Sequence, residues 1–396
     1  MRKGFIFVAI LLLIGLWGWS KYGTYFNLFR NTPPSGVIDV APTAITPSVS
    51  DPKLNHLELP SGFNIQYFAD NVPGARSLTR GASGTVYVGT RPQGVVYALE
   101  DENLDGVADK RYVVANDLNS PNGVAYMGGD LYVAEISRII KFEGIDTTYQ
   151  NKPEYKIVYD KLPSDVHHGW KYLSIGPNNK LYVAIGMPCN VCEAGEIYGT
   201  ILRLNLDGSN PTIIARGIRN SVGFDWDPVD DSLWFTDNGR DNLGEDIPPD
   251  ELNRVGAENL NFGFPYCHAG IILDPVFGKG KNCGDFVAPA SVLGPHVAAL
   301  GMKFYTGNMF PPQYRNKILI AEHGSWNRKV PIGYRVSTVD VTRDKSSNYS
   351  QFITGWLATN GKITGRPVDI LELDDGSILI SDDFAGAVYR VTYRPK

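Results

Sequence analysis

The feature that most constrains the fold is a short strand pattern that recurs six times along the chain. Each copy places a hydrophobic segment, rich in β-branched and aromatic residues, after a turn that contains Gly, Asn or Asp. The copies are TVYVGT from 85, DLYVAEI from 130, KLYVAIG from 180, SLWFTDN from 232, KILIAEH from 317 and SILISDD from 377. Repeats of about 40 to 60 residues built from antiparallel strands, with almost no helical periodicity, are typical of β-propellers. The sequence therefore predicts an all-β fold, a six-bladed β-propeller of four-stranded antiparallel blades.

The two ends of the repeat region predict how the ring closes. The last repeat ends at Tyr393 after three strands, whereas the strand FNIQYFAD at 63–70 stands alone before the first repeat. We expect this early strand to complete the last blade, because that arrangement removes exposed strand edges. The stretch at about 242–300 does not fit a blade connection and predicts an insertion after the fourth blade.

The N-terminal part of the chain differs from the propeller in composition. An uncharged hydrophobic stretch at 4–19 follows two basic residues, which is typical of a signal peptide or a signal anchor. No small-x-small cleavage site follows it, so within residues 1–21 we favour an uncleaved hydrophobic helix. Residues 22–55 are rich in Pro, Ser and Thr and predict an extended tether. We expect a periplasmic propeller at 56–396 that meets the inner membrane only through the N-terminal segment.

Charge and composition limit the partners of this chain. Lys and Arg total 37 and Asp and Glu total 42, so the net charge is −5 and no large basic face for a nucleic acid is implied. Hydrophobic residues make up 43% and charged residues only 20%, which excludes a disordered chain or a coiled coil.

Strand direction predicts which loops share a face of the propeller. In a blade with strands A to D, the loops that enter A and the loops that join B to C lie on one face, because successive antiparallel strands reverse direction. The A-to-B loops of this chain are ordinary turns such as GASG and PNNK. The other face gathers the polar loops VHHGW, GMPCNVCE, GIRN, DNGRDNLGED, EHGSWNR and TGRP. His, Arg, Asn and Trp converge there from several blades, which predicts a polar site on this face.

Several of these runs, taken in order, resemble one family. The runs are HHGWKYLSIGPNNKLYVAIG, YGTILRLNLDGSNP, GIRNSVGFDWDP, NFGFPYC, HGSWNR, GRPVDI and ISDD. They are similar to the soluble quinoprotein sugar dehydrogenase superfamily, and most to its sorbosone dehydrogenase-like branch, over roughly residues 55–394. The resemblance implies a six-bladed propeller that uses pyrroloquinoline quinone (PQQ) and calcium to oxidise a small sugar or related aldehyde, with an external electron acceptor.

The resemblance also implies roles for individual residues. His168 takes the place of the general base, and an imidazole suits proton abstraction near neutral pH; its neighbour His167 is the weaker candidate. PQQ carries three carboxylates, which guanidinium groups bind well. The implied cofactor ligands are Arg219, Asn220, Arg366, Arg328 and Lys329. For Arg219 the alternative is a structural arginine that bonds loop carbonyls, and for Arg328 and Lys329 a structural role is equally open.

Calcium binds oxygen ligands, often backbone carbonyls. The resemblance implies that the carbonyls of Gly239 and Arg240 hold the catalytic calcium, although Arg240 stands where the glucose-oxidising branch has Pro. Asp250 and Glu251 are similar to acidic residues that bind structural calcium, and two solvated carboxylates are the alternative.

A second calcium pattern comes from the residues alone. The run DENLDGVAD matches positions 1, 3, 5 and 9 of a calcium-binding loop with Asp101, Asn103, Asp105 and Asp109. Position 12 is Tyr112 rather than the bidentate Glu. A structural metal loop and a plain Asp/Asn turn both explain the run, on the face away from His168.

Four cysteines occur, at 189, 192, 267 and 283. In an exported chain disulfides are the favoured interpretation. Zinc is weaker because fifteen residues separate the second pair, and c-type haem is excluded because Glu193 follows the first pair. The favoured pairing is Cys189 with Cys192 and Cys267 with Cys283, but the sequence alone does not fix the connectivity.

Departures from the family pattern leave the substrate and alternative functions open. Met187 stands where the glucose-oxidising branch has an acidic residue, and Pro121 where it has Gln, so sugar specificity does not transfer. The alternatives are a calcium-dependent lactonase and a non-catalytic extracytoplasmic binding propeller, between which the fold does not decide. For Trp170, Trp326 and Tyr334 we favour packing between blades over stacking on a ligand.

Overall fold

The computed structural model describes residues 43–44, 52–342 and 345–395. The hydrophobic segment at 4–19 and most of the tether lie outside this range, so the signal anchor and the periplasmic location stay predictions. Within the described ranges no helix has both the length and the apolar character needed to cross a membrane.

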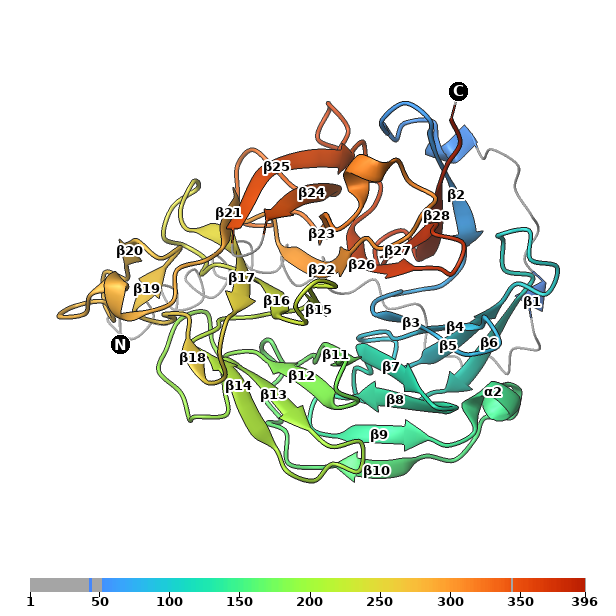
Figure 1. Ribbon diagram of the computed structural model, residues 1–396, viewed down its shortest axis with the longest axis horizontal. Coiled ribbons are helices and arrows are strands. Elements are labelled where there is room, and N and C mark those ends of the chain that lie inside the picture. Colours follow the sequence, from blue (N-terminus) through green and yellow to red (C-terminus); the bar gives the residue numbers. More distant parts are fainter. Residues whose placement is uncertain (1–42, 45–51, 343–344, 396) are drawn as a thin grey trace, which may run out of the picture. The chain divides into compact units, whose positions relative to one another are not determined.

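The described chain forms six blade sheets, each containing four blade strands, and one separate two-stranded sheet. The blades are arranged in a ring around a central axis, as Figure 1 shows. This arrangement confirms the predicted six-bladed, all-β propeller. The innermost strands are β3 (Leu78–Arg80), β7 (Gly123–Met127), β11 (Leu173–Ile175), β15 (Phe224–Trp226), β22 (Ala299–Phe304) and β26 (Pro367–Glu372).

The six hydrophobic repeats are the second strands of the blades. These strands are β4 (Val86–Val88), β8 (Asp130–Ala134), β12 (Leu181–Ile185), β16 (Leu233–Asp237), β23 (Ile318–Glu322) and β27 (Ile378–Asp382). Every residue of β12, β16, β23 and β27 is buried. Both faces of each such strand are covered by a neighbouring blade, which explains hydrophobic runs in place of strict polar alternation.

The outer half of each blade follows in chain order. The third strands are β5 (Val96–Glu100), β9 (Ile139–Phe142), β13 (Thr200–Leu204), β17 (Pro249–Val255), β24 (Arg335–Thr342) and β28 (Ala387–Tyr393). The outermost strands are β6 (Lys110–Ala115), β10 (Lys156–Tyr159), β14 (Thr212–Arg216), β21 (Ser291–Pro295), β25 (Lys345–Ile353) and β2 (Phe63–Ala69).

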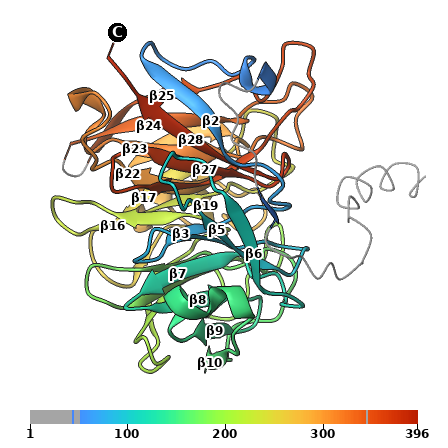
Figure 2. The ribbon, with the colours of Figure 1, turned by 90° about the vertical axis from the view of Figure 1, so that its right-hand side faces the viewer.

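The ring closes through its two ends, as predicted. Strand β2 pairs antiparallel with β28, with Phe63 opposite Tyr393 and Ile65 opposite Val391, and Figure 2 shows the two strands side by side. The Phe63 ring lies 5.0 Å from the Tyr393 ring and 4.9 Å from the Phe352 ring of the fifth blade. The last blade is therefore joined to its neighbour by aromatic contacts as well as by strand pairing.

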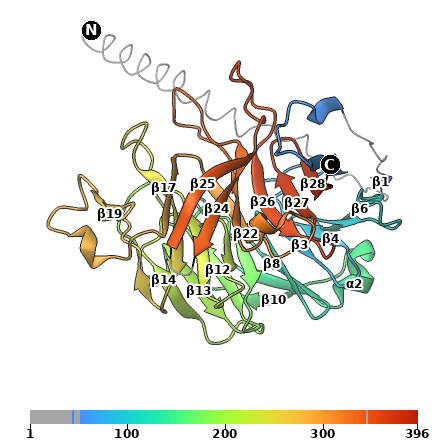
Figure 3. The same cartoon turned by 45° about the horizontal axis from the view of Figure 1, so that its top comes forward.

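The stretch 242–300 differs from our expectation of an insertion after the fourth blade. It contains β17 and β21, the last two strands of that blade, together with the start of β22. The added chain is narrower, residues 256–290, and includes the hairpin of β19 (Cys267–His268) and β20 (Ile272–Leu273), whose β19 strand Figure 3 shows at the edge of the ring. The remaining elements are β1 (Thr43–Ala44), η1 (Pro52–Leu54), α2 (Ile145–Thr148), η2 (Tyr149–Asn151), β18 (Leu260–Asn261), η3 (Cys283–Asp285) and η4 (Pro312–Tyr314).

Buried aspartates tie neighbouring blades together. Asp369 in the sixth blade accepts a hydrogen bond from the Leu78 backbone N–H of the first, at 2.9 Å. Asp225 in the fourth blade accepts one from the Phe304 N–H of the fifth, also at 2.9 Å. Burial raises the pKa of Asp369 to about 7. The inner strands are thus held by polar contacts at positions where a purely apolar core would leave backbone groups unpaired.

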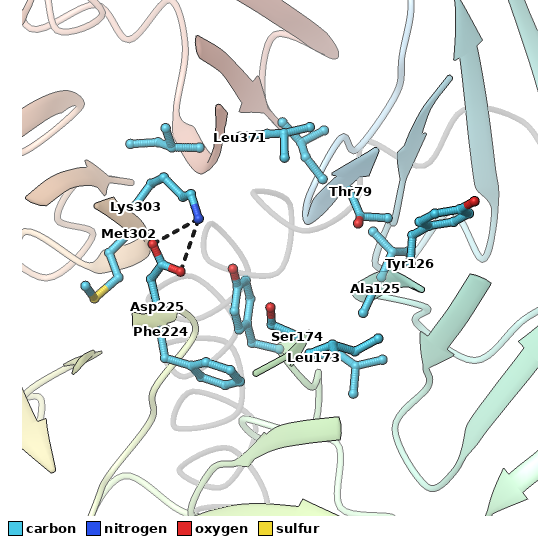
Figure 4. A pocket seen from close by; sticks show the side chains of 15 residues that line it. Thr79, Ala125, Tyr126, Leu173, Ser174, Phe224, Asp225, Met302, Lys303 and Leu371 are labelled. Carbon is cyan, nitrogen blue, oxygen red and sulfur yellow. Dashed lines mark hydrogen bonds and ion pairs between the residues drawn. The ribbon is translucent and has the colours of Figure 1, made fainter. Parts of the chain in front are cut away.

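A cavity of about 200 Å³ lies between the inner strands and contains none of the residues that we predicted for the site. Figure 4 shows Lys303 reaching Asp225 there, and their ion pair measures 3.0 Å. This cavity is therefore separate from the polar loops described next.

Candidate functional site

His168 lies in the loop that enters the third blade, and its side chain is buried. The Nδ1 atom is 2.9 Å from the Met187 carbonyl oxygen. Because a carbonyl only accepts hydrogen bonds, Nδ1 carries the proton and the lone pair lies on Nε2. No described residue forms a hydrogen bond with Nε2. His168 also has φ of 49°, a left-handed backbone conformation that is uncommon outside glycine and that often marks functional positions.

The surroundings of His168 keep its imidazole neutral. Burial lowers the pKa of His168 well below the ordinary value of 6.5, and the charge of Arg219 and the adjacent His167 lower it further. The His167 ring lies 4.1 Å from the His168 ring but is exposed. At neutral pH the Nε2 of His168 is therefore an available proton acceptor.

Gly186 allows the His168 loop to approach the end of β12. A Cβ atom on Gly186 would lie 2.6 Å from the His168 Cβ and 3.0 Å from Asn220 Oδ1. The next residue, Met187, accepts the His168 hydrogen bond and donates its own N–H to the Arg219 carbonyl at 2.8 Å. The base and the Arg219–Asn220 pair are thus joined through one short backbone segment.

Arg219 and Asn220 are positioned by Asp237 at the end of β16. The two Asp237 oxygens accept the backbone N–H groups of Arg219 at 2.9 Å and Asn220 at 2.7 Å. The Arg219 guanidinium donates to Asn190 O at 2.9 Å, to Asn190 Oδ1 at 2.9 Å and to Asn238 O at 3.2 Å. Arg219 therefore makes contacts with loop carbonyls, which are the contacts of the alternative, structural role that the sequence left open for this residue.

Asp241 joins three loops above Arg219, and the sequence did not point to it. One Asp241 oxygen accepts from Arg219 at 2.7 Å, and the other accepts from Asn327 Nδ2 at 2.7 Å. Its backbone N–H donates to Asn190 Oδ1 at 2.8 Å. Blades three, four and five each supply one member of this cluster. No local spacing pattern could have found it, because its members are 22 to 86 residues apart from Asp241.

Both disulfides have the predicted pairing, Cys189 with Cys192 and Cys267 with Cys283. The first closes a short ring around Asn190, the residue that binds Arg219 and Asp241. The second joins the β19 hairpin to η3. A disulfide beside the site thus holds one of the loops that position Arg219.

On the opposite side of the site, Arg366 is bound to neutral partners. Its guanidinium lies 3.3 Å from His323 Nδ1 and donates to the Tyr334 hydroxyl at 3.1 Å. Burial lowers the pKa of His323 to about 4, so its ring is neutral. His323 Nε2 lies 2.8 Å from Asp383, which also pairs with Arg76 at 3.0 Å. The sequence predicted Arg366 but not the His323–Asp383 pair that positions it.

Two further implied cofactor ligands are bound elsewhere. Arg328 donates to the Glu245 carbonyl and pairs with Asp246 at 3.0 Å. The Lys329 side chain is 89% exposed, and its nearest acid is Glu245 at 3.7 Å. Both therefore attach the loop after β23 to the loop after β16, and neither contact involves His168 or Arg219.

The implied calcium ligands Gly239 and Arg240 lie next to Asp241. The Gly239 N–H donates to Asp250 Oδ1 at 2.8 Å, and the Arg240 side chain pairs with Asp274 at 2.5 Å. In the described chain no donor bonds the carbonyl oxygens of Gly239 or Arg240. These two carbonyls thus fit a hard cation as ligands, and calcium here stays a prediction.

Asp250 and Glu251 are buried, which contradicts the alternative of two solvated carboxylates. Burial raises the pKa of Asp250 to about 7. Burial and the facing Asp237 also raise the pKa of Glu251. Asp250 accepts N–H groups from Gly239 and Ala299, so its observed role is to fix the loop after β16.

The predicted calcium loop at 101–109 forms a turn stabilised by its own side chains. Asp101 accepts from the Gly106 N–H at 2.9 Å, Asn103 from the Asp105 N–H at 2.9 Å and Asp109 from the Glu102 N–H at 2.8 Å. These contacts are those of an Asp/Asn turn. Over the described ranges, no group of three or more His, Cys, Asp or Glu residues is arranged to hold a metal ion, and a metal at this loop stays a prediction.

The three aromatic residues have different environments. Trp170 packs on Val222, Leu300 and Val368 near the starts of three inner strands, and Tyr334 is 2% exposed. Core packing is therefore confirmed for these two residues. Trp326 is 56% exposed, so the prediction of a core role for it was wrong.

Unpaired polar atoms on this face provide a test of fit for a polar anionic cofactor. Asn220 Oδ1, Asn327 Oδ1 and Trp170 Nε1 are buried and have no hydrogen-bond partner. Arg91, which the sequence analysis missed, makes no hydrogen bond or ion pair through its guanidinium with any described residue. The donors in this set, Trp170 Nε1 and the Arg91 guanidinium, fit the carboxylates and carbonyls of a flat ligand, whereas the two amide oxygens would accept from a ligand N–H. PQQ carries both kinds of group, so the residues present fit PQQ.

Comparisons with known proteins agree with this arrangement. The family model for glucose/sorbosone dehydrogenases matches residues 136–326, and a TrAA12-like model matches residues 277–393. An uncharacterized protein of Borreliella burgdorferi is 35% identical over 394 residues, which cover 93% of this chain and 97% of that protein. A PQQ-dependent pyranose dehydrogenase of Coprinopsis cinerea is 25% identical over 228 residues, 45% of this chain but only 31% of the enzyme.

Solved structures show the same fold at lower identity. The calcium structure of a Trichoderma reesei carbohydrate-active enzyme of family AA12 has a TM-score of 0.75 and 20% identity, and covers 85% of this chain and 97% of that one. The matches do not single out the sorbosone branch, which stays a prediction. With the ordered motifs, the six blades and these relatives together, the chain belongs to the superfamily of soluble PQQ-dependent glucose and aldose dehydrogenases.

Proposed function

We propose that this protein is a PQQ- and calcium-dependent dehydrogenase that oxidises a sugar or a related aldehyde or alcohol, with His168 as the general base. The observation that carries the proposal is the state of His168. Its Nδ1–H is committed to Met187, and its Nε2 is open on the face where Asn220, Arg219 and Arg366 converge. A buried neutral imidazole with one open nitrogen is suited to remove a proton from a substrate hydroxyl.

Each residue of the proposed site would have a separate role in the reaction. PQQ, when bound, supplies the electron acceptor for the substrate carbon. His168 Nε2 takes the hydroxyl proton, and the Met187 carbonyl stabilises the resulting imidazolium through the Nδ1–H. Arg366 would hold cofactor oxygens, the open Oδ1 of Asn220 would accept from a cofactor N–H, and the carbonyls of Gly239 and Arg240 would hold calcium. Because Arg219 is paired with Asp241, it acts chiefly through its charge and by fixing the loop.

The finer parts of the proposal concern substrate and location. Relatives named as pyranose and aldose sugar dehydrogenases support a sugar substrate. The resemblance of the motifs to the sorbosone dehydrogenase-like branch is the ground for proposing an enzyme of that type, and it does not name the sugar. The hydrophobic segment at 4–19 supports a periplasmic enzyme attached to the inner membrane, which would pass electrons to a separate acceptor.

The test is a titration of the purified chain with PQQ in the presence and absence of calcium, followed by dye reduction across a panel of sugars and aldehydes. We expect saturable, calcium-dependent PQQ binding and sugar-dependent dye reduction. His168→Ala should bind PQQ with unchanged affinity and lose turnover, whereas the control His56→Ala should keep it, because His56 is an exposed residue that contacts Thr364. Absence of PQQ binding by the wild-type chain would refute the proposal and leave the lactonase or the binding propeller.

A further inference from the structure

Arg91 lies near the ring centre, and its guanidinium stacks on Trp170 but forms no hydrogen bond or ion pair with a described residue. It lies in the loop between β4 and β5, on the same face as His168. Its guanidinium carbon is 3.8 Å from the centroid of the Trp170 ring. Trp170 in turn rests on Val222, Leu300 and Val368, which lie near the starts of the inner strands of blades four, five and six. This stacking places Arg91 above the middle of the ring.

The charges around Arg91 do not balance. Among the described residues, Asp383 is the only carboxylate whose charge attracts Arg91. Asp383 is already bound by Arg76 at 3.0 Å and by His323 at 2.8 Å. Arg366, on the other side of His323, contacts only the neutral His323 ring and the Tyr334 hydroxyl through its guanidinium. Asp369 interacts with Arg76, and Asp382 accepts the Arg366 backbone N–H, but neither carboxylate acts on Arg91. Among the described residues the Arg91 guanidinium therefore has no carboxylate of its own.

The Arg91 charge is only partly hydrated. Burial, together with the charge of nearby Arg76, lowers the pKa of Arg91 to about 10, yet the group stays charged at neutral pH. A charge held away from water without a partner costs free energy, and an incoming anion removes that cost. A planar guanidinium stacked on an aromatic ring has its N–H edge directed outward, the geometry that binds a carboxylate with two parallel hydrogen bonds. The buried indole N–H of Trp170, also unpaired, adds a nearby donor.

We propose that Arg91, stacked on Trp170, is a further carboxylate-binding residue of this site. The identity of the ligand rests on the proposed function. Its carboxylate belongs either to PQQ or to an acidic sugar bound beside PQQ. The His168 ring lies 6.1 Å from the Trp170 ring, so a carboxylate on Arg91 would be held close to the proposed base.

The first arm of the test asks whether the carboxylate is that of PQQ. The variant Arg91→Met keeps most of the side-chain stem and removes the charge, and Arg91→Lys keeps the charge without the planar fork. The matched control is Arg80→Met, which removes a charge from the A-to-B face, where Arg80 pairs with Asp374. Equilibrium dialysis gives the Kd for PQQ and for its trimethyl ester, which lacks the carboxylate charges.

We expect Arg91→Met to raise the Kd of PQQ on the order of 30-fold and to leave the Kd of the ester almost unchanged. Arg91→Lys should give an intermediate value, and Arg80→Met should match the wild type. Equal weakening of PQQ and ester in Arg91→Met would overturn the cofactor assignment, because the loss would then reflect packing on Trp170.

The second arm applies if the Kd of PQQ does not change. Wild type and Arg91→Met, both saturated with PQQ, are compared by the inhibition constant of glucuronate against a neutral sugar substrate. A large increase in that constant only in Arg91→Met assigns the carboxylate to the substrate, and equal constants overturn the inference. If the wild-type chain binds no PQQ, the proposed function fails separately. The Arg91 site is then tested by the rise in melting temperature with citrate, which should occur in wild type and not in Arg91→Met; equal rises overturn it.

Discussion

Replacement of Asp241 by Ala tests whether the loop cluster above Arg219 is essential to the fold of this face. The Arg219 side chain is 4% exposed and that of Asp241 is 17% exposed, so their 2.7 Å ion pair is largely withheld from water. Breaking one side of a buried pair costs about 3–5 kcal/mol of the free energy of unfolding, because a charge is left buried without its counterion. Arg219 keeps its three bonds to Asn190 and Asn238, which reduces the loss. We therefore expect about 2–3 kcal/mol.

The assay is urea unfolding at pH 7 followed by tryptophan fluorescence. Asp246→Ala is the matched control, because Asp246 belongs to the same loop and pairs with Arg328 at 3.0 Å but is 83% exposed. An exposed pair of this kind contributes less than about 1 kcal/mol. Asp241→Asn separates charge from hydrogen bonding, since its amide oxygen still accepts from Arg219.

A double-mutant cycle with Arg219→Met completes the design. We expect a coupling free energy of about 1–2 kcal/mol between the two residues, because they are in direct contact. A loss below about 1 kcal/mol in Asp241→Ala, or additive losses in the double variant, would refute the claim that a buried ion pair holds these loops.

Three further predictions concern the proposed base and its supports. Gly186→Ala should reduce turnover at least about 10-fold, because its Cβ would lie 2.6 Å from the His168 Cβ; an unchanged kcat would contradict this packing. Because burial and Arg219 hold the pKa of His168 below 6.5, kcat/KM should fall only as the pH drops through a value below 6.5. Arg219→Met should move that acid limb to higher pH, and a pH–rate profile with the limb unmoved would remove Arg219 as a cause. Replacing Cys189 and Cys192 by Ala should weaken PQQ binding several-fold by releasing Asn190, with little change in melting temperature because the closed loop is short. A large drop in melting temperature with unchanged PQQ affinity would show a purely structural disulfide.

Much of the fold could be predicted from the chain itself. The six hydrophobic repeats became the buried second strands of six blades, and the lone strand at 63–70 pairs with β28 as expected. Local sequence predicts such strands because burial between blades demands a continuous hydrophobic run. The stretch at 242–300 was misjudged because β17 carries Asp250, Glu251 and Asn253 on its buried positions, which hides a core strand behind a polar sequence.

The candidate site was predicted in outline only. Strand direction placed the loops of His168, Arg219 and Arg366 on one face, and the contacts around these loops link blades three, four, five, six and one. The partners that set their chemistry were not predictable, since the contacts of Asp241, Asp383 and Arg91 join residues that are far apart in the sequence, even where the run around the residue was itself singled out.

The sequence by itself determined the number of blades, the closing strand, the shared face and the family. These properties depend on the order and spacing of hydrophobic segments and motifs, which can be read along the chain without knowledge of its contacts. The tertiary structure decided how each charge is used: Arg219 is paired with Asp241, Arg366 contacts a neutral histidine, and Arg91 stacks on Trp170 with no ion pair to a described residue. Charge balance is a property of distances between loops of different blades, and only the closed ring sets those distances.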